Sequence, residues 1–219
     1  MGQWGRWGVT VLLAIAIPVS AGMLSNASTP ASSAITSHYG TAGLERVQRW
    51  QALITRLKGQ SVTAQLAGVN DFFNQLGFVD DVNIWHQEDY WATPIEFLGV
   101  GRGDCEDFAL AKYLTLLELG VPDDQMRLHY VKYVPYDQFH MVLSWAATPQ
   151  QMPVLLDNIN KTIAPATSRR DLIPIYSFNG SSLWTSTASG QEAPVGSSSH
   201  LSRWEDWQVR VRNGAMQSP

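Results

Sequence analysis

Two segments in the N-terminal half place hydrophobic residues at helical spacing. Residues 44–57 and 62–76 repeat apolar side chains every three or four positions, with polar residues between them, so each is predicted to form an amphipathic helix. Residues 108–117 are apolar around most of a helical circumference, and Gly120-Val121-Pro122 supplies a stop after them. These residues are predicted to form a buried central helix that starts near Cys105.

The C-terminal half changes to short apolar runs separated by turns that contain proline. Short connections between successive strands favour antiparallel pairing, so the predicted class is α+β. Residues 180–199 are dominated by Ser, Gly and Thr and are predicted to be a mobile surface loop. Residues 201–211 regain aromatic and apolar character and are predicted to return as a final strand. The earlier predicted strands are 126–134, 139–146, 153–157 and 173–178.

The N-terminus has the pattern of a secretory signal. Arg6 precedes an apolar stretch over residues 9–17, and Val19-Ser20-Ala21 supplies small residues for cleavage after Ala21. The apolar stretch is shorter than the roughly 20 residues that span a bilayer, although an uncleaved anchor remains an alternative. We therefore expect a signal peptide over residues 1–21, a flexible leader over 22–38, one domain over 39–219, and export.

Composition narrows the classes of function. The formal net charge is −4, and the 15 basic residues are scattered, so no nucleic-acid partner is expected. The single cysteine, Cys105, excludes an internal disulfide. Because a lone thiol is a liability in an oxidising compartment, it favours a functional role, although a small buried hydrophobe is the alternative.

Cys105 lies in a setting suited to a nucleophile. The flexible run Gly101-Arg102-Gly103 precedes it, and the expected helix start would offer unpaired N–H groups to a thiolate or an oxyanion. His140 and Asp157 follow along the chain, in the order that a thiol, its base and the orienting acid require. Cysteine hydrolase is therefore the leading hypothesis.

The base and its partner are predicted from strand pairing. Residues 147–152 have a turn length suited to a hairpin, which would bring Asp157 close to His140; otherwise Asp157 is a strand-end acid in water. His129 is the competing base, but it lies in the middle of a predicted strand, where a satisfied core or surface histidine is expected. His140 is preferred.

Three carboxylates flank the thiol and would oppose its ionisation. Asp104, Glu106 and Asp107 offer hard oxygen ligands, so bound Ca²⁺ would relieve this repulsion. The alternative is that these acids only complement the dipole of a helix start, which needs no metal. The spacing of the three acids does not favour either interpretation, the calcium site or the helix-dipole role. Zinc fits less well because there is only one thiol and the histidines are scattered.

The aromatic stretch from Trp85 to Phe97 has two interpretations. It either walls a cleft or packs in the core. A non-catalytic binding module that docks a partner through this stretch, with Cys105 buried and inert, is a third hypothesis for the whole protein.

Three motifs resemble a known family. Gly103–Ala109 (GDCEDFA), Phe139–Leu143 (FHMVL) and Leu155–Asn158 (LLDN) occur in the order found in the bacterial transglutaminase-like cysteine proteinases of the LapG type, periplasmic adhesin-releasing proteases. The resemblance covers about Tyr39 to Phe178. It implies a papain-like or transglutaminase-like core, with a nucleophile-bearing central helix packed on an antiparallel sheet and preceded by N-terminal helices.

The same resemblance implies a function. Cys105 would be the nucleophile, His140 the general base and acid, and Asp157 the orienter, with calcium dependence and with Asp104 and Glu106 as ligands. Such proteins are periplasmic and clip the N-terminal region of a large surface adhesin near a dialanine-type site, which disperses biofilm. The periplasmic domain of an inner-membrane cyclic di-GMP receptor sequesters them. A transglutaminase-like acyl transferase or a cell-wall amidase would use the same acyl-enzyme and remains an alternative.

Overall fold

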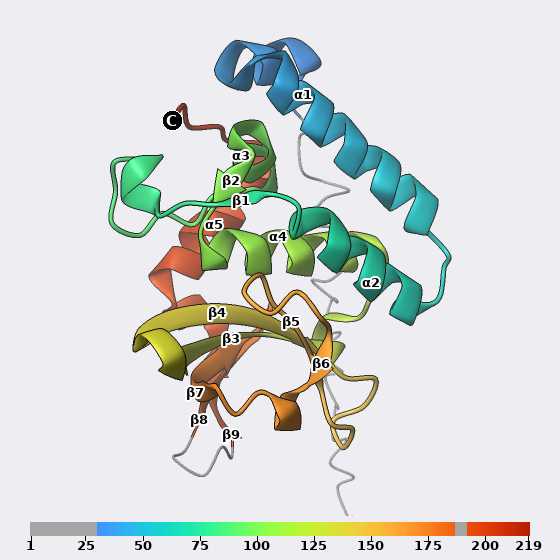
Figure 1. The fold of residues 1–219 in the computed structure, drawn as a ribbon, viewed down its shortest axis with the longest axis vertical. Coiled ribbons are helices and arrows are strands. Elements are labelled where there is room, and N and C mark those ends of the chain that lie inside the picture. Colours follow the sequence, from blue (N-terminus) through green and yellow to red (C-terminus); the bar gives the residue numbers. More distant parts are fainter. Residues whose placement is uncertain (1–29, 187–191) are drawn as a thin grey trace, which may run out of the picture.

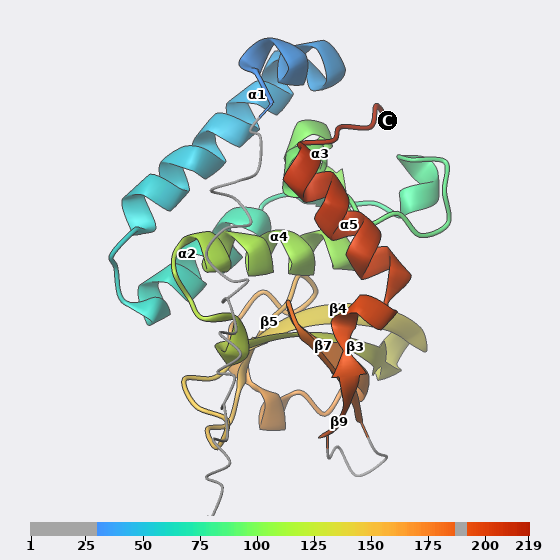
Figure 2. The same cartoon turned by 180° about the vertical axis from the view of Figure 1, so that it is seen from behind.

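The computed structural model describes residues 30–186 and 192–219, in which helices cover one face of an antiparallel sheet (Figures 1 and 2). The α+β prediction, with a central helix on the sheet and helices before it, is confirmed. The predicted signal peptide and the start of the predicted leader lie outside the described residues. Within these ranges, none of the helices has the length and apolarity that crossing a bilayer would need.

In the described residues, five α-helices lie on the upper side of the sheet as Figure 1 is drawn. The first starts earlier than predicted, because part of the expected flexible leader is helical and packs through buried Ile35. A break at Gly40 (φ 70°) separates this first part from the remainder of the helix. The helices are α1 (Ser32–Leu57), α2 (Val62–Phe73), α3 (Pro94–Val100), α4 (Cys105–Glu118) and α5 (Ser202–Asn213).

Helix α4 lies at the centre of the molecule. It packs on strand β4 (Gln138–Trp145), which lies below it in Figure 1, and on helices α2 and α3, so almost its whole circumference is buried. This enclosure explains why its sequence lacks a polar stripe. The predicted buried central helix is confirmed, and it carries Cys105 at its first position.

Over residues 30–186 and 192–219, the main sheet has seven strands in the order β6-β5-β4-β3-β7-β8-β9, and every neighbouring pair is antiparallel. The four predicted strands are confirmed as β3, β4, β5 and β7. A separate parallel pair, β1 with β2, joins the aromatic stretch to the start of α4. The strands are β1 (Gly77–Phe78), β2 (Arg102–Gly103), β3 (Met126–Tyr133), β5 (Val154–Leu156), β6 (Ala164–Pro165), β7 (Leu172–Phe178), β8 (Ser182–Ser186) and β9 (Glu192–Ser197).

Two predictions for the C-terminal part are wrong. The expected loop over 180–199 contains the hairpin strands β8 and β9, in which Trp184 is covered by the Arg127 guanidinium 3.9 Å from its ring centre. The expected final strand over 201–211 is helix α5. Trp204, Trp207 and Val211 are its buried residues and follow helical spacing, whereas Val209 is exposed. The four-residue spacing of Trp207 and Val211 fits both the period of a helix and that of a strand, which is why the sequence pattern wrongly indicated a strand.

The aromatic stretch before α4 is core. Trp85, Tyr90 and Trp91 are each less than 10% exposed, and Phe97 is fully buried. Helix α5 contributes to this packing, because Trp207 Nε1 donates to the Ala92 carbonyl at 3.0 Å. The binding-module hypothesis requires a docking surface made from these side chains, and that prediction is therefore wrong.

We expect Trp207→Ala to destabilise the protein strongly. The indole is fully buried, stacks on Trp204 with ring centres 5.1 Å apart, and would leave a large cavity. Truncations of this kind cost about 3 to 5 kcal/mol. Urea unfolding followed by circular dichroism measures the loss. Val209→Ala, on the exposed face of the same helix, is the matched control and should stay within about 0.5 kcal/mol of the wild type.

Candidate active site and metal centre

Two glycines shape the loop that delivers Cys105. Gly101 ends α3 in the left-handed region (φ 79°), which a side chain would strain. At Gly103 a β-carbon would lie 2.2 Å from Oδ2 of Asp107, so only glycine lets the backbone pass this carboxylate. Asp104 then occupies the N-cap, and Cys105 enters α4 among the unpaired amides of the first turn, as predicted.

The Cys105 thiol is enclosed. The residue is 9% exposed, its Sγ donates to Oε2 of Glu106 at 2.8 Å, and the backbone N–H of Met141 in β4 donates to the sulfur. Burial raises the pKa of Cys105, and the negative charges of Glu106 and Asp104 raise it further. These effects outweigh the Met141 hydrogen bond, so the acidic flank keeps the thiol protonated unless a cation offsets it.

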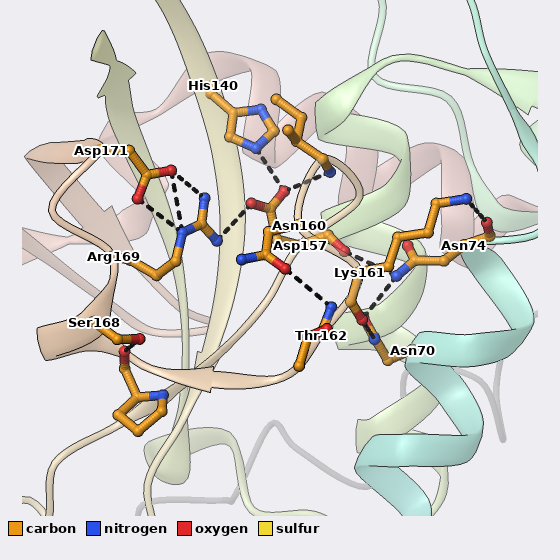
Figure 3. Close-up of polar contacts among 12 residues, drawn as sticks. Asn70, Asn74, His140, Asp157, Asn160, Lys161, Thr162, Ser168, Arg169 and Asp171 are labelled. Atoms are coloured by element: carbon orange, nitrogen blue, oxygen red, sulfur yellow. Dashed lines mark hydrogen bonds and ion pairs between the residues drawn. The ribbon is translucent and has the colours of Figure 1, made fainter. Parts of the chain in front are cut away.

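His140 and Asp157 meet as predicted. Strands β4 and β5 pair antiparallel, with Leu143 opposite Leu156, so Asp157 leaves the end of β5 beside His140. His140 Nε2 lies 2.8 Å from Oδ1 of Asp157 (Figure 3). With Asp157 ionised, Nε2 carries the proton and Nδ1 is free to act as the base. Both side chains are buried, which shields this pair from water.

Asp157 has further partners that keep it ionised. The Ile159 backbone N–H donates to Oδ1 at 3.0 Å, and Arg169 Nη1 lies 2.8 Å from Oδ2. Burial opposes ionisation, but the hydrogen bond and charge of His140, together with Ile159 and Arg169, outweigh it and hold the pKa of Asp157 below its usual value. Sequence reasoning missed Arg169, which is followed directly by a second arginine, Arg170. Arg170 is exposed and Arg169 is buried.

Cys105 and His140 line one pocket. Its remaining wall is mostly aromatic or aliphatic and comes from both sides of the nucleophile: from β1, from the turn between β3 and β4, and from the segment after Asp157. Such a lining suits an extended, mostly apolar segment of chain. The other lining residues are Phe78, Tyr133, Tyr136, Gln138, Phe139, Asn158 and Ile159.

His129 lies elsewhere. Its Nε2 is 2.8 Å from the Ser144 hydroxyl and its Nδ1 is 3.5 Å from Glu192, in a pocket that Cys105 does not line. Burial lowers the pKa of His129 to about 4, although the Glu192 charge acts in the opposite direction. It is a satisfied structural histidine, as its position in the middle of a predicted strand indicated.

An acidic group surrounds the start of α4. Asp81, Asp104 and Asp107 each place a carboxylate oxygen within 4.8 Å of the others. In the part of the chain that the structure describes, Oδ1 of Asp81, Oδ1 of Asp104 and Oδ2 of Asp107 are buried without a hydrogen-bond donor. Buried acceptors without donors are costly, so this arrangement fits a hard cation.

The pKa values in this group reflect the same crowding. Burial raises the pKa of Asp104 to about 11, and the charges of Glu106, Asp107 and Asp81 contribute to the shift. Burial likewise raises the pKa of Asp81 to about 6 and that of Asp107 well above its usual value. A bound cation would reverse these shifts by favouring the ionised acids.

The acidic group differs in membership from the predicted ligands. Asp104 and Asp107 belong to it, whereas Glu106 directs its carboxylate to the Cys105 thiol. Asp81 was not anticipated, because it lies in the short 3₁₀ turn Asp81–Asn83, far from Cys105 in sequence. Only the tertiary fold brings it to the start of α4, where its Oδ2 also accepts the Tyr90 backbone N–H.

A cysteine at a helix start, with a histidine–aspartate pair on the adjoining sheet, defines a cysteine hydrolase arrangement of the papain and transglutaminase kind. Residues 46–190 match the family described as bacterial transglutaminase-like cysteine proteinase BTLCP. The chain belongs to this family, which is a family of cysteine peptidases. The comparison of this chain with curated proteins found no match.

Solved structures of Legionella pneumophila LapG are similar to this chain. The EGTA-treated form is 38% identical, with a TM-score of 0.72 over 84% of this chain and 98% of LapG. The calcium-bound form is 39% identical, with a TM-score of 0.70 over 82% of this chain and 96% of LapG. The likeness therefore extends to a protein for which a calcium-bound state is known.

Proposed function

We propose that this chain is a calcium-dependent periplasmic cysteine endopeptidase that cleaves the N-terminal region of a large surface adhesin, releasing the adhesin and promoting biofilm dispersal. The observation that carries the proposal is the pocket that Cys105, at the start of α4, lines together with His140, whose ring is held by Asp157. Family membership supports the peptidase class. The adhesin and the periplasmic location rest on the family resemblance and on the signal pattern over residues 1–21.

The proposed chemistry uses three side chains. Nδ1 of His140 takes the Cys105 proton, and the thiolate sulfur forms a bond to the scissile carbonyl carbon. His140 then protonates the leaving amine as the C–N bond breaks, which leaves an acyl-enzyme. A water molecule that His140 deprotonates displaces the thiol. Asp157 stabilises the imidazolium throughout, and backbone amides of the first turn of α4 are placed to receive the oxyanion.

Calcium would be held by Asp81, Asp104 and Asp107, whose unpartnered buried oxygens suit a hard cation. Bound there, it supplies positive charge beside the nucleophile loop and offsets the repulsion that keeps the thiol protonated. The calcium-bound structure of the L. pneumophila relative supports this proposal. Glu106 adjoins Asp107 and lies two positions after Asp104 in the sequence, and it remains a further proposed ligand.

A receptor partner is also proposed. The periplasmic domain of an inner-membrane cyclic di-GMP receptor would sequester the protease when the nucleotide is abundant. The exposed apolar residues Phe78, Tyr136 and Phe139 border the nucleophile pocket and offer a surface on which a bound receptor would block substrate entry. The Trp85–Trp91 region is not available for this role, because its large side chains are buried.

Cleavage of a recombinant adhesin N-terminal region tests the proposal. With calcium present, purified protein should give a single cut, and prior alkylation of Cys105 should prevent it. Adding an amine donor separates the alternatives: mass spectrometry will find a water-terminated fragment for a peptidase and an amine adduct for an acyl transferase. No cut in adhesin regions from several bacteria, together with release of peptide from cell wall, would favour the amidase.

Calcium removal should lower thermal stability in a pH-dependent way. The raised pKa values of Asp81, Asp104 and Asp107 mean that, without calcium, the folded state binds more protons than the unfolded state above about pH 4. Stability of the calcium-free protein therefore falls as pH rises. Because calcium binds the ionised acids, it should raise the melting temperature more at about pH 8 than at about pH 5.

Differential scanning fluorimetry with calcium or with EGTA measures this effect. Asp81→Asn should abolish the calcium-induced rise, whereas Asp71→Asn, an exposed acid on α2, should retain it. An equal melting temperature with calcium and with EGTA at about pH 8 would remove the proposed metal site.

A further inference from the structure

The two carboxylate oxygens of Asp157 have different partners. Oδ1 receives His140 Nε2, and Oδ2 faces Arg169 Nη1, each at 2.8 Å (Figure 3). The side chains of Asp157 and Arg169 are 0% and 4% exposed, so this pair is shielded from water. Arg169 therefore contacts the acid of the proposed triad on the side opposite the histidine.

Arg169 is itself held in one orientation. Its Nε donates to Oδ1 of Asp171 at 3.0 Å, and its Nη2 donates to Oδ2 at 2.8 Å. This forked contact fixes the guanidinium plane. Nη1 remains for Asp157, so one arginine links two acids through different nitrogens. Because Asp171 balances one charge, Arg169 does not depend on Asp157 alone for neutralisation.

The backbone of Asp157 is fixed separately. Its carbonyl accepts from Nδ2 of Asn74, the C-cap residue of α2, at 2.9 Å and from Lys112 Nζ of α4 at 3.1 Å. Lys112 Nζ also donates to Asn74 Oδ1 at 2.8 Å, and Lys161 Nζ donates to the Asn74 carbonyl (Figure 3). These contacts hold the backbone and leave the carboxylate free to rotate about its own bonds. Contacts to the carboxylate oxygens themselves oppose that rotation: the Ile159 backbone N–H and His140 act on Oδ1, and Arg169 is the contact on Oδ2.

We propose that Arg169 is a positioning residue of the triad: it holds Oδ2 of Asp157 so that Oδ1 stays turned toward His140. The inference rests on the proposed function, because the orientation of Asp157 matters only if His140 serves Cys105. The titratable and charged groups around Asp157 are His140, Arg169, Lys112 and Lys161, with Asp171 behind Arg169. Of these groups, Arg169 and His140 reach the carboxylate oxygens.

The test measures the rate of Cys105 alkylation by iodoacetamide in the calcium-loaded protein, a readout that needs no known substrate. Arg169→Met should slow the reaction about tenfold, since a small misplacement of an orienting group has effects of this size. Arg169→Lys should recover part of the rate because it restores the cation. Arg170→Met, the exposed neighbour, is the matched control and should react like the wild type.

A double-mutant cycle separates positioning from stability. If Arg169 acts through Asp157, Arg169→Met should not slow the reaction further in an Asp157→Asn background. Equal slowing in both backgrounds, or an Arg169→Met rate equal to that of Arg170→Met, overturns the inference. Should Arg169→Met not fold, Arg169→Met combined with Asp171→Asn removes the ion pair together and allows the same comparison. A wild-type thiol no faster than in unfolded protein would instead refute the proposed function.

Discussion

Replacing Cys105 by alanine is expected to abolish peptide cleavage while leaving the fold intact. The chain has no second thiol, and the pocket that holds His140 offers no other nucleophile of this type. Removal of a triad nucleophile lowers turnover by about 10⁴- to 10⁶-fold. Cleavage of the adhesin N-terminal region, followed by gel electrophoresis and mass spectrometry, measures the loss.

Stability should change little in this variant. Alanine keeps the first position of α4 filled, and the thiol that it removes donates a single hydrogen bond, to Glu106. Ser144→Ala is a suitable control. It removes a hydroxyl from a buried residue of β4 that does not line the nucleophile pocket, so this variant should retain full cleavage. Cleavage that persists in Cys105→Ala would eliminate Cys105 as the nucleophile.

Asp157→Asn is expected to have the next largest effect, a loss of about 10³- to 10⁴-fold in turnover. The amide that replaces the carboxylate has one oxygen and one NH₂ group, so only one of its two sides can present an oxygen acceptor. The charged Arg169 on one side is a stronger donor than the Ile159 backbone N–H on the other, so the oxygen should turn to Arg169 and the NH₂ group to His140. Nε2 would then accept a hydrogen bond and the ring proton would move to Nδ1, the nitrogen required as base.

Folding should survive this change, because Arg169 keeps its forked contact with Asp171. Single-turnover cleavage kinetics measure the effect. The exposed Asp124→Asn is the matched control and should be unchanged. Adding Arg169→Met to Asp157→Asn removes the group that turns the amide the wrong way, so this double variant should be no slower than Asp157→Asn. A fully active Asp157→Asn protein would exclude Asp157 from the mechanism.

Local pattern identified most of the elements that carry the proposed triad. The continuous apolar run after Cys105 predicted a buried helix, and a turn-length segment between two apolar strands predicted the pairing that joins His140 to Asp157. These features depend on residues close in sequence, where periodicity and turn length constrain the backbone directly. The same reasoning failed for α5, since Trp207 and Val211 satisfy both periods, and only the burial of Trp204 and the exposure of Val209 distinguish helix from strand.

The chain order of Cys105, His140 and Asp157, the helix start at the nucleophile and the excess of acid beside it follow from the sequence. Three features follow only from the fold: Asp81 as a member of the acidic group, Arg169 as a partner of Asp157, and the burial of Trp85 and Trp91. Asp81 and Arg169 each reach the site from a segment whose local pattern carries no sign of it. The physical reason is that a buried charged group interacts with the groups closest to it in space, and the packing of segments distant in sequence decides which groups those are.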